Sequence, residues 1–507
     1  MNRENRKKDT VTRDTILLTV LSMALQALGL IFNVKLSDTA GTAAVGIMSL
    51  IMSFFSCIMI LANGNIFVST SRFVSEENEN GGNIFHVMRM SLTFSLLLSG
   101  SFSVISFAAS DHIAVNILKS PELGLAVRIL SFSLTPAAVG SCIKGYFHGL
   151  RKIKVPMRGD ITEFALKWAV MAALMFIPRD MNFYVITACS VCVGEIASCI
   201  YYVCSFVHSI HTYSRRLSDK CILENGRAYM KANLPIVVIG YVQMIMSAAN
   251  EAIVPATLLG YNTSADEALS QYGMFEAMII PAIFFPAVAM SSMSNIMIPE
   301  AAAALRAGRE RLERLIGESF RKCFSYSFFI SGMFLCFGSS LGRIMCPSDE
   351  LVSRSLKILA PVIPFIYLEF ILEGLLKGMG KQNFSTVNSL FEYIVRIGCV
   401  IIFVPRIGFG GVIISYYASN CISNIVRIIA VCRAARLKFD LIGFIIIPVM
   451  KAAVCCLCGE VMGMLLPTDE GILPLAAKAI TAALVYYLLG GLSKNRKEAS
   501  CNIILEN

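Results

Sequence analysis

Long apolar runs separated by short polar loops recur along the chain from Thr15 to Leu492. A run of about 20 apolar residues is long enough to cross a bilayer as a helix. Helices satisfy their own backbone hydrogen bonds, as hydrocarbon requires, and the sequence lacks the alternating pattern of barrel strands. The pattern therefore predicts an all-α polytopic membrane protein with about 14 transmembrane helices. The predicted spans are 15–36, 42–68, 87–109, 123–147, 159–178, 183–207, 232–257, 269–297, 323–346, 352–376, 384–404, 409–432, 441–466 and 472–491.

Composition agrees with this class. Of 507 residues, 56% are hydrophobic and only 15% are charged, whereas a soluble protein carries about 25% charged residues. The first fourteen residues are too polar for a cleaved signal peptide, so we expect the first apolar run to be retained as a span. The 17 cysteines are scattered through the spans without histidine partners. This favours small packing residues over a metal site or a disulfide framework.

Lysine and arginine gather in alternate loops, and this bias predicts the orientation. The basic segments are the N-terminus, the C-terminal tail and the loops that contain Arg151, Arg215, Arg306, Lys377 and Arg433. We therefore expect a multi-pass protein of the plasma membrane with both termini cytoplasmic, which requires an even number of spans. These loops also explain the net charge of +10, so it does not indicate nucleic acid. No GxxxxGKS or GxxxxGKT motif occurs, and we expect neither a nucleotide nor a cofactor.

Two segments of the chain resemble one another. GYFHGLRKIKVPMRGDITEFALKW (145–168) aligns with GLLKGMGKQNFSTVNSLFEYIVRI (374–397) at a constant offset. The matches are Gly145 with Gly374, Gly149 with Gly378, Lys152 with Lys381, Glu163 with Glu392 and Lys167 with Arg396. The loops Pro178-Arg179 and Pro405-Arg406 also correspond, and Gln26 and Asn33 match Gln243 and Asn250 more weakly.

The two copies lie six spans apart, and an even separation gives them the same orientation in the membrane. They are therefore predicted to be parallel repeats related by an axis along the membrane normal. The expected architecture is two six-helix lobes in pseudo-twofold parallel repeat, plus two C-terminal helices. The predicted parts are an N-terminal lobe (1–208), a cytoplasmic linker (209–231), a C-terminal lobe (232–432), two extra helices (441–491) and a cytoplasmic tail (492–507).

Charged side chains within the spans are costly at bilayer depth, so each is expected to face a cavity or a partner. They are Arg128, Glu163, Lys167, Glu195, Glu251, Glu276, Glu369, Glu373, Glu392, Arg396, Arg427, Lys451, Glu460 and Lys478. Lys451 and Lys478, in the last two spans, are expected to reach an interface or to bind lipid phosphate.

The repeat-related pairs Glu163–Lys167 and Glu392–Arg396 each place an acid and a base at i and i+4 on one helix face. Two interpretations stay open. The pairs are either intrahelical ion pairs that neutralise two costly groups, or they line a central cavity in which the basic members bind an anionic head group. In the second case Lys167 and Arg396 are the head-group candidates, and Arg128, nearer the predicted outer face, receives the head group later.

Glu251 and Glu276 lie in the seventh and eighth spans, and Gln243 and Asn250 are close to Glu251 in sequence. A carboxylate near the bilayer midplane can bind a cation or a proton, so these four residues are candidates for ion coupling or for lining the cavity. The coupling cation, Na⁺ or H⁺, stays open. No metal site and no catalytic residue is predicted.

Three motifs carry a resemblance to a known family: FVSTSRFVSEE (67–77), GYFHGLRKIKVP (145–156) and EGLLKGMGKQNFSTVNS (373–389). On these motifs and the span count, nearly the whole chain resembles the multidrug/oligosaccharidyl-lipid/polysaccharide (MOP) exporter superfamily, and more closely its polysaccharide-biosynthesis flippases, which include sporulation proteins. The resemblance implies two six-helix lobes forming a V around a central cavity, plus two terminal helices. It also implies movement of an undecaprenyl-pyrophosphate-linked sugar from the inner to the outer leaflet by alternating access.

The chain departs from the lipid II flippases of that superfamily in its first span. Those relatives carry cavity-lining arginines there, whereas LSMALQALGLIFNVKLSD (21–38) has no arginine. The resemblance therefore does not imply that lipid II is the substrate of this chain. Binding of a head group would have to use cations outside the first span.

The leading hypothesis is a transporter that flips a polyprenyl-(pyro)phosphate-linked oligosaccharide or cell-wall precursor, with that lipid-linked glycan and the membrane lipids as its partners. One alternative is a cation-coupled multidrug exporter of the same superfamily, for which twelve spans would be usual. A second is an integral-membrane enzyme acting on polyprenyl lipids. None of the 5 histidines lies beside a DxxD-like cluster, so the sequence favours a protein that is not an enzyme.

Overall fold

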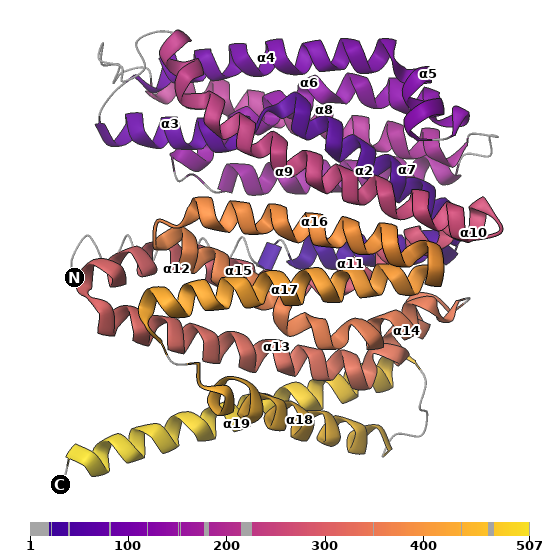
Figure 1. The fold of residues 1–507 in the computed structure, drawn as a ribbon. Coiled ribbons are helices and arrows are strands. Elements are labelled where there is room, and N and C mark those ends of the chain that lie inside the picture. Colours follow the sequence, from indigo (N-terminus) through magenta and orange to yellow (C-terminus); the bar gives the residue numbers. More distant parts are fainter. Residues whose placement is uncertain are drawn as a thin grey trace. The chain divides into compact units, whose positions relative to one another are not determined.

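The computed structural model describes residues 20–38 (without 22), 41–80, 83–150 (without 119), 152, 154–176, 182–213, 226–347, 349–437, 439–464 and 471–505. Within these ranges the chain is almost wholly helical and contains no strand, which confirms the predicted all-α class (Figure 1). Several predicted features lie outside the described residues: the basic N-terminus, Arg151, the basic loop from Arg215 to Lys220 and the Pro178-Arg179 turn. The side chains of the C-terminal tail also lie outside them.

The chain forms two compact units, each described here by itself. Unit 1 comprises Met1–Leu25 and Gly46–Ala252, and unit 2 comprises Gln26–Val45 and Ile253–Asn507. These units differ from the predicted lobes in two segments. Residues 26–45, in and after the first predicted span, belong to unit 2, and residues 232–252, of the seventh, belong to unit 1.

Unit 1 is built mainly from long helices. They are α2 (Thr42–Asn63, of which the greater part lies in this unit), α3 (Ile66–Asn80), α4 (Ile84–Ala108), α6 (Gly124–Gly149), α7 (Lys154–Phe176), α8 (Phe183–Tyr213) and the first part of α9 (Gly226–Tyr261). Short elements join α4 to α6: α5 (Ser110–His112), a π-helical turn η1 (Ile113–Ile117) and a 3₁₀ turn η2 (Pro121–Leu123).

Unit 2 contains the remaining helices. They are α10 (Ala265–Met274), η4 (Phe275–Ile279), α11 (Ile280–Phe284), α12 (Val288–Ala307), α13 (Arg309–Met345), α14 (Glu350–Leu359), η5 (Ala360–Val362), α15 (Ile363–Gly378), α16 (Gln382–Ile407), α17 (Phe409–Ala435), η6 (Ile442–Ile446), α18 (Ile447–Met464) and α19 (Ile472–Leu505). Prolines cause two of the breaks: Pro286 lies where Ala265–Phe284 and Val288–Ser294 bend by 57°, and Pro361 lies in η5.

Each of the fourteen predicted spans has a helical segment in the structure. Within the described residues, ten helices are long and apolar enough to cross a membrane, and the bent pair at Pro286 makes an eleventh. The other three are helical but fall short of that measure. Helix α7 carries several charges, Leu473–Leu489 is short, and the first span is described only from residue 20.

The matched glycines explain part of the internal repeat. In unit 1, a Cβ added to Gly145 would lie 2.7 Å from the carbonyl oxygen of Phe67, and one on Gly149 would lie 2.7 Å from that of Ser71. Helix α6 therefore crosses α3 backbone against backbone, as small residues spaced by four allow in membrane helices.

Unit 2 contains the same crossing. A Cβ on Gly374 would lie 2.6 Å from the carbonyl oxygen of Ser294, and one on Gly378 would meet the carbonyl oxygen of Ile298. Helix α15 thus crosses α12 as α6 crosses α3. Two pairs of glycines matched in sequence thus make equivalent contacts in the two units, which is the behaviour expected of a structural repeat.

The two extra C-terminal helices pack on α13. A cluster of Phe329, Phe337, Cys455 and Ala482 joins α13, α18 and α19. Gly332 of α13 allows close approach to α18, because a Cβ there would lie 3.0 Å from Sγ of Cys456. The last two helices are therefore an integral part of unit 2 (Figure 1).

Candidate functional site

A row of buried polar residues runs along α17. Ser415, Ser419, Ser423 and Arg427 recur at every fourth position, and all four are fully buried. Residues spaced by four lie on one face of a helix, and side chains of α16 contact this face at Ser419, Ser423 and Arg427. The side-chain nitrogens of Asn420 and Asn424 donate hydrogen bonds to backbone carbonyl oxygens of their own helix. The result is a polar seam inside a pair of membrane helices.

Arg427 is the largest fully buried side chain of the described residues. Its Nη1 lies 3.0 Å from Glu369 Oε1 on α15 and 3.3 Å from Glu392 Oε2 on α16. The same nitrogen lies 3.3 Å from Asn424 Oδ1, and Nη2 donates to Ser389 Oγ at 3.0 Å. One guanidinium therefore connects the three helices α15, α16 and α17.

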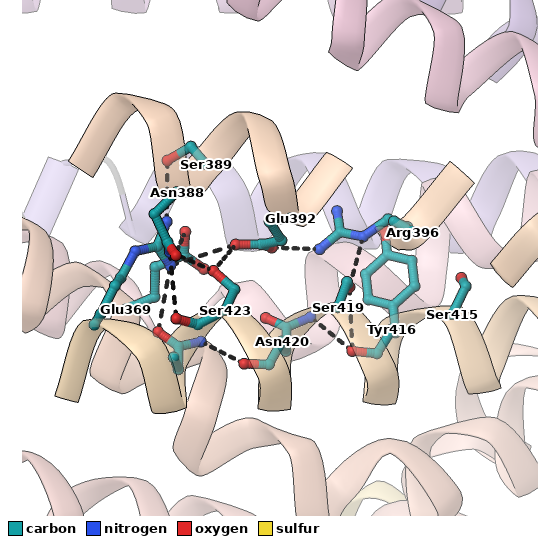
Figure 2. Close-up of polar contacts among 12 residues, drawn as sticks. Glu369, Asn388, Ser389, Glu392, Arg396, Ser415, Tyr416, Ser419, Asn420 and Ser423 are labelled. Carbon is teal, nitrogen blue, oxygen red and sulfur yellow. Dashed lines mark hydrogen bonds and ion pairs between the residues drawn. The ribbon is translucent and has the colours of Figure 1, made fainter. Parts of the chain in front are cut away.

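Glu392 and Arg396 extend this cluster along α16. Arg396 Nη2 donates to Glu392 Oε1 at 2.7 Å, and its Nε donates to Ser419 Oγ at 3.0 Å. The guanidinium also lies 4.5 Å from the ring centroid of Tyr416, within cation–π range. The second carboxylate oxygen of Glu392 accepts a hydrogen bond from Ser423 Oγ at 2.9 Å (Figure 2).

Two carboxylates and two guanidinium groups balance one another in this cluster, which we call the unit 2 cluster (Glu369, Glu392, Arg396 and Arg427). Buried charges are tolerated when they are paired and hydrogen-bonded, and each of these four groups has such a partner. Within the described residues, only Nε of Arg427 is buried without a hydrogen-bond partner in this group.

A related but different set of charges lies in unit 1. Lys144 Nζ of α6 lies 2.6 Å from Asp160 Oδ1 of α7. The hydroxyl of Tyr202, on α8, donates to Asp160 Oδ1 and to the carbonyl oxygen of Pro156, both at 3.1 Å. Glu163, Lys167 and Glu195 interact electrostatically with one another, and both glutamates also interact with Lys144 and Asp160. We call Lys144, Asp160, Glu163, Lys167 and Glu195 the unit 1 cluster.

The two clusters occupy equivalent places in the repeat. The offset that relates Glu163 to Glu392 also relates Asp160 to Ser389. In unit 1, Asp160 of α7 accepts a hydrogen bond from Tyr202 of the following helix, α8. In unit 2, Ser389 of α16 accepts a hydrogen bond from Arg427 of the following helix, α17. The repeat keeps the contact and changes the side chains that make it.

Lys167 and its repeat mate Arg396 have different surroundings. Within the described residues, no carboxylate oxygen lies within 4.0 Å of Lys167 Nζ, and Glu163 and Glu195 likewise have no cation within that distance. The ammonium of Lys167 lies 5.7 Å from the ring centroid of Trp168. The pair predicted from sequence is thus formed in unit 2, by Glu392 and Arg396, and not in unit 1.

Arg128, in unit 1, has partners outside the unit 1 cluster. Its Nε donates to Ser110 Oγ at 2.8 Å and its Nη2 pairs with Asp111 at 2.5 Å, at the junction of α4, α5 and α6. The side chains of Arg128 and Asp111 are 45% and 72% exposed. Arg128 therefore forms an ion pair with Asp111, and the side chains of both residues are exposed.

The predicted coupling residues fall in different units. Gln243, Asn250 and Glu251 belong to unit 1, and Glu276, in the π-helical turn η4, belongs to unit 2. Glu251 accepts a hydrogen bond from Ser247 on its own helix at 3.2 Å. Asn250 is buried, and its Oδ1 has no hydrogen-bond partner among the described residues. The coupling role of these residues stays a prediction.

Two of the residues that organise the unit 2 cluster were not chosen as site residues from sequence. Glu369 and Arg427 stood only among the charged positions within spans. The spacing of Ser415, Ser419, Ser423 and Arg427 is the signal that could have identified the seam, because small polar residues at every fourth position of an apolar helix mark one buried face.

Metal and disulfide chemistry find no support in the part of the chain that the structure describes. No group of three or more His, Cys, Asp and Glu side chains there could hold a metal ion. The cysteines with described side chains are all free.

Comparison with known proteins agrees with this architecture. The sequence model of the family named polysaccharide biosynthesis protein matches residues 11–295, and the MatE model matches residues 256–402. Stage V sporulation protein B of Bacillus subtilis (strain 168) is 21% identical over 417 residues, which cover 80% of this chain and 79% of that protein.

Solved structures share the fold. The inward-facing conformation of a multidrug resistance MATE family transporter of the MOP superfamily has a TM-score of 0.65 at 14% identity and covers 82% of this chain and 94% of its own. The inward closed conformation of the lipid II flippase MurJ has a TM-score of 0.65 at 11% identity and covers 95% of this chain and 99% of its own.

The protein is a multi-pass membrane flippase or exporter of the MOP superfamily, as its helical fold and its matches to these families, relatives and structures together show. Since the family model covers more than half of the chain, it belongs to the polysaccharide biosynthesis protein family. The expectation that it is not an enzyme rests on this membership alone.

Proposed function

We propose that the protein moves a polyprenyl-(pyro)phosphate-linked oligosaccharide or cell-wall precursor from the inner to the outer leaflet of the plasma membrane by alternating access, with both termini cytoplasmic. A pyrophosphate carries about two negative charges, and moving it unaided through hydrocarbon is prohibitive, as it is for charged side chains. Fixed cations along a wet path offset that cost, and a lysine ammonium is well suited to bind phosphate as a compact point charge.

Lys167 carries this proposal. It lies on α7, in the fifth predicted span, and among the described residues no carboxylate oxygen lies within 4.0 Å of its ammonium. Glu163 and Glu195 act on its charge from a greater distance, so no ion pair within the described residues holds the ammonium, and it can turn to a substrate anion. Arg396, in contrast, already donates to Glu392 and Ser419. We therefore assign head-group binding first to Lys167, and we assign to Arg396 a role that depends on the integrity of its cluster. Glu163 and Glu392 modulate these two cations.

Four single variants test this assignment: Lys167→Gln, Glu163→Gln, Arg396→Gln and Glu392→Gln. We expect Lys167→Gln to abolish flipping of a lipid-linked glycan in proteoliposomes while the amount and melting temperature of purified protein stay unchanged. Glu163→Gln should be milder, because it leaves the cation in place. Arg158→Gln is the matched control, since Arg158 lies on the same helix and is exposed.

The variants of unit 2 give the contrasting result. Arg396→Gln and Glu392→Gln should each lower both transport and melting temperature, because each breaks a buried ion pair. If all four variants lose expression equally, both pairs are structural and the head-group role of Lys167 is rejected.

A second candidate is a cation-coupled multidrug exporter, and the match of the MatE model to residues 256–402 favours it. The two candidates differ in what a cell accumulates. Deletion of the gene should cause accumulation of a lipid-linked precursor if the protein is a flippase. Sensitivity to cationic drugs without such accumulation would instead identify the exporter.

A further inference from the structure

A pocket of about 630 Å³ lies within unit 2, where the two extra helices meet α12 and α13. Its charged lining is mostly basic. Arg321 and Lys322 come from α13, Lys451 comes from α18, and Asp440 precedes η6. Tyr326 and Tyr486 complete the wall together with apolar residues. Three cations thus face one carboxylate, which leaves an excess of two positive charges.

These three cations form no ion pair in the part of the chain that the structure describes. Within the described residues, Arg321, Lys322 and Lys451 have no carboxylate oxygen within 4.0 Å. Asp440 is engaged at the start of η6, where its Oδ1 accepts a hydrogen bond from the backbone nitrogen of Gly443 at 2.9 Å. The pocket therefore presents positive charge to whatever enters it.

Lys451 and Lys478 are the two lysines of the extra helices within their apolar segments, and the structure separates them. Lys478 of α19 lies 3.5 Å from Glu460 of α18, so it has a partner inside the protein. Lys451 lies in the first turns of α18 and lines the pocket instead. A lysine in an apolar helix is costly unless it meets an anion or water, so an anion in the pocket would stabilise it.

The walls of the pocket are held in place before any ligand binds. The hydroxyl groups of Tyr486 and Ser325 lie 3.0 Å apart, and the Tyr326 hydroxyl donates to the carbonyl oxygen of Pro286 at 2.9 Å. The ring of Tyr486 stacks on Phe329 with centroids 4.4 Å apart. Such packing lowers the ordering cost of binding, because the lining side chains need not be immobilised by the ligand.

The position of the pocket along α13 indicates which anion it takes. Arg321 and Lys322 stand where the basic segment before residue 323 meets the apolar span predicted at 323–346. This is the depth of lipid phosphates, and basic pockets between membrane helices bind the head groups of anionic lipids. We propose that the pocket formed by α12, α13, α18 and α19 binds the phosphate of an anionic membrane lipid. Anionic glycerophospholipids and polyprenyl phosphates share this group, whereas the phosphate of phosphatidylcholine is neutralised by its own choline.

Binding is tested on the purified full-length protein in detergent by native mass spectrometry. The probes are phosphatidylglycerol, phosphatidylcholine, a polyprenyl phosphate and inorganic phosphate. The variants are Lys451→Gln, Lys451→Arg and the double variant R321Q/K322Q. The controls are Lys478→Gln on α19 and R311Q/R314Q, which removes two exposed cations from α13 outside the pocket.

We expect Lys451→Gln and R321Q/K322Q to weaken binding of a lipid phosphate about tenfold or more, equivalent to about 1.4 kcal/mol. Lys451→Arg and both controls should bind as the wild type does, and phosphatidylcholine should not distinguish the variants. A loss confined to phosphatidylglycerol identifies a glycerophospholipid site, a loss confined to the polyprenyl phosphate identifies a site for that lipid, and a loss of both identifies a shared site. Weakening of inorganic phosphate alone would show a free-phosphate site and would overturn the lipid assignment.

Equal binding by the wild type, Lys451→Gln and R321Q/K322Q would also overturn the proposal, as would equal weakening by R311Q/R314Q, which would indicate diffuse attraction by the basic surface. If Lys451→Gln fails to fold, R321Q/K322Q decides alone, because it alters exposed side chains. The inference is independent of the proposed transport, since it concerns binding to α13, α18 and α19 and does not require flipping.

Discussion

The guanidinium of Arg427 lies 3.0 Å from the carboxylate of Glu369, and the whole of the arginine is buried. Glu392 approaches the same nitrogen at 3.3 Å from another helix. Arg427 is thus the cation shared by two carboxylates, and the three helices α15, α16 and α17 depend on it for charge balance.

Arg427→Met should therefore destabilise the protein strongly. The substitution leaves Glu369 without a cation at that contact and Glu392 with Arg396 alone, and breaking a buried pair typically costs about 3–5 kcal/mol. Thermal unfolding of the detergent-solubilised protein measures the change. Arg354→Met is the control, because the exposed Arg354–Glu350 pair, at 3.6 Å, should contribute less than about 1 kcal/mol.

A double variant separates charge balance from packing. If charge balance is the cause, E369Q/R427M should be less damaging than Arg427→Met alone, because it removes the unpaired carboxylate as well. An equal loss in the two would show that Arg427 acts by filling space.

Gly374→Ala should destabilise unit 2. Its Cβ would lie 2.6 Å from the carbonyl oxygen of Ser294, so α15 and α12 must separate, and such overpacking costs about 1–3 kcal/mol. The repeat predicts a similar loss for Gly145→Ala, whose Cβ would lie 2.7 Å from the carbonyl oxygen of Phe67. Both changes should appear as lower melting temperatures.

The control for these glycines is Gly398→Ala on α16, where an added Cβ meets nothing within 4 Å. It should be neutral or stabilise the helix by up to about 1 kcal/mol, since alanine is the better helix former. A loss at Gly398 equal to that at Gly374 would contradict the crossing as the cause.

Lys144 and Asp160 should be energetically coupled. Their side chains are 31% and 33% exposed, and the carboxylate also accepts a hydrogen bond from Tyr202. A double-mutant cycle with Lys144→Met and Asp160→Asn should give a coupling energy of about 0.5–3 kcal/mol. The same cycle at the more exposed Arg128–Asp111 pair should give about 0.2–1 kcal/mol. The reverse order would contradict the role of burial.

The topology is tested separately from the fold. A reporter fused after Asn507, and one inserted near Asn225, should both read as cytoplasmic, because lysine and arginine concentrate in the loops on that predicted side. A signal from the outer side at either position would contradict the fourteen-span arrangement and the predicted orientation together.

The sequence indicated the class of fold through features that are local in the chain. Hydropathy alone located the helices, because a span must be apolar over the thickness of the bilayer wherever it packs. The glycine matches at Gly145 and Gly374 were visible as a pattern, but their cause, contact with the carbonyl groups of Phe67 and Ser294, depends on which helices cross. The polar row on α17 was also readable from spacing, although its partner helix was not.

The sequence by itself determined that the chain is a repeated bundle of membrane helices with charges inside it. Only the tertiary structure decided which charges meet. Glu392–Arg396 and Glu163–Lys167 look alike in the sequence, because each has an acid and a base at i and i+4. In the structure, Glu392 and Arg396 form an ion pair and contact Ser419, Ser423 and Arg427 of α17. Glu163 and Lys167 form no ion pair among the described residues. The reason is that helix periodicity orders side chains along one helix, whereas the partner of a buried charge is set by which other helices pack against that face.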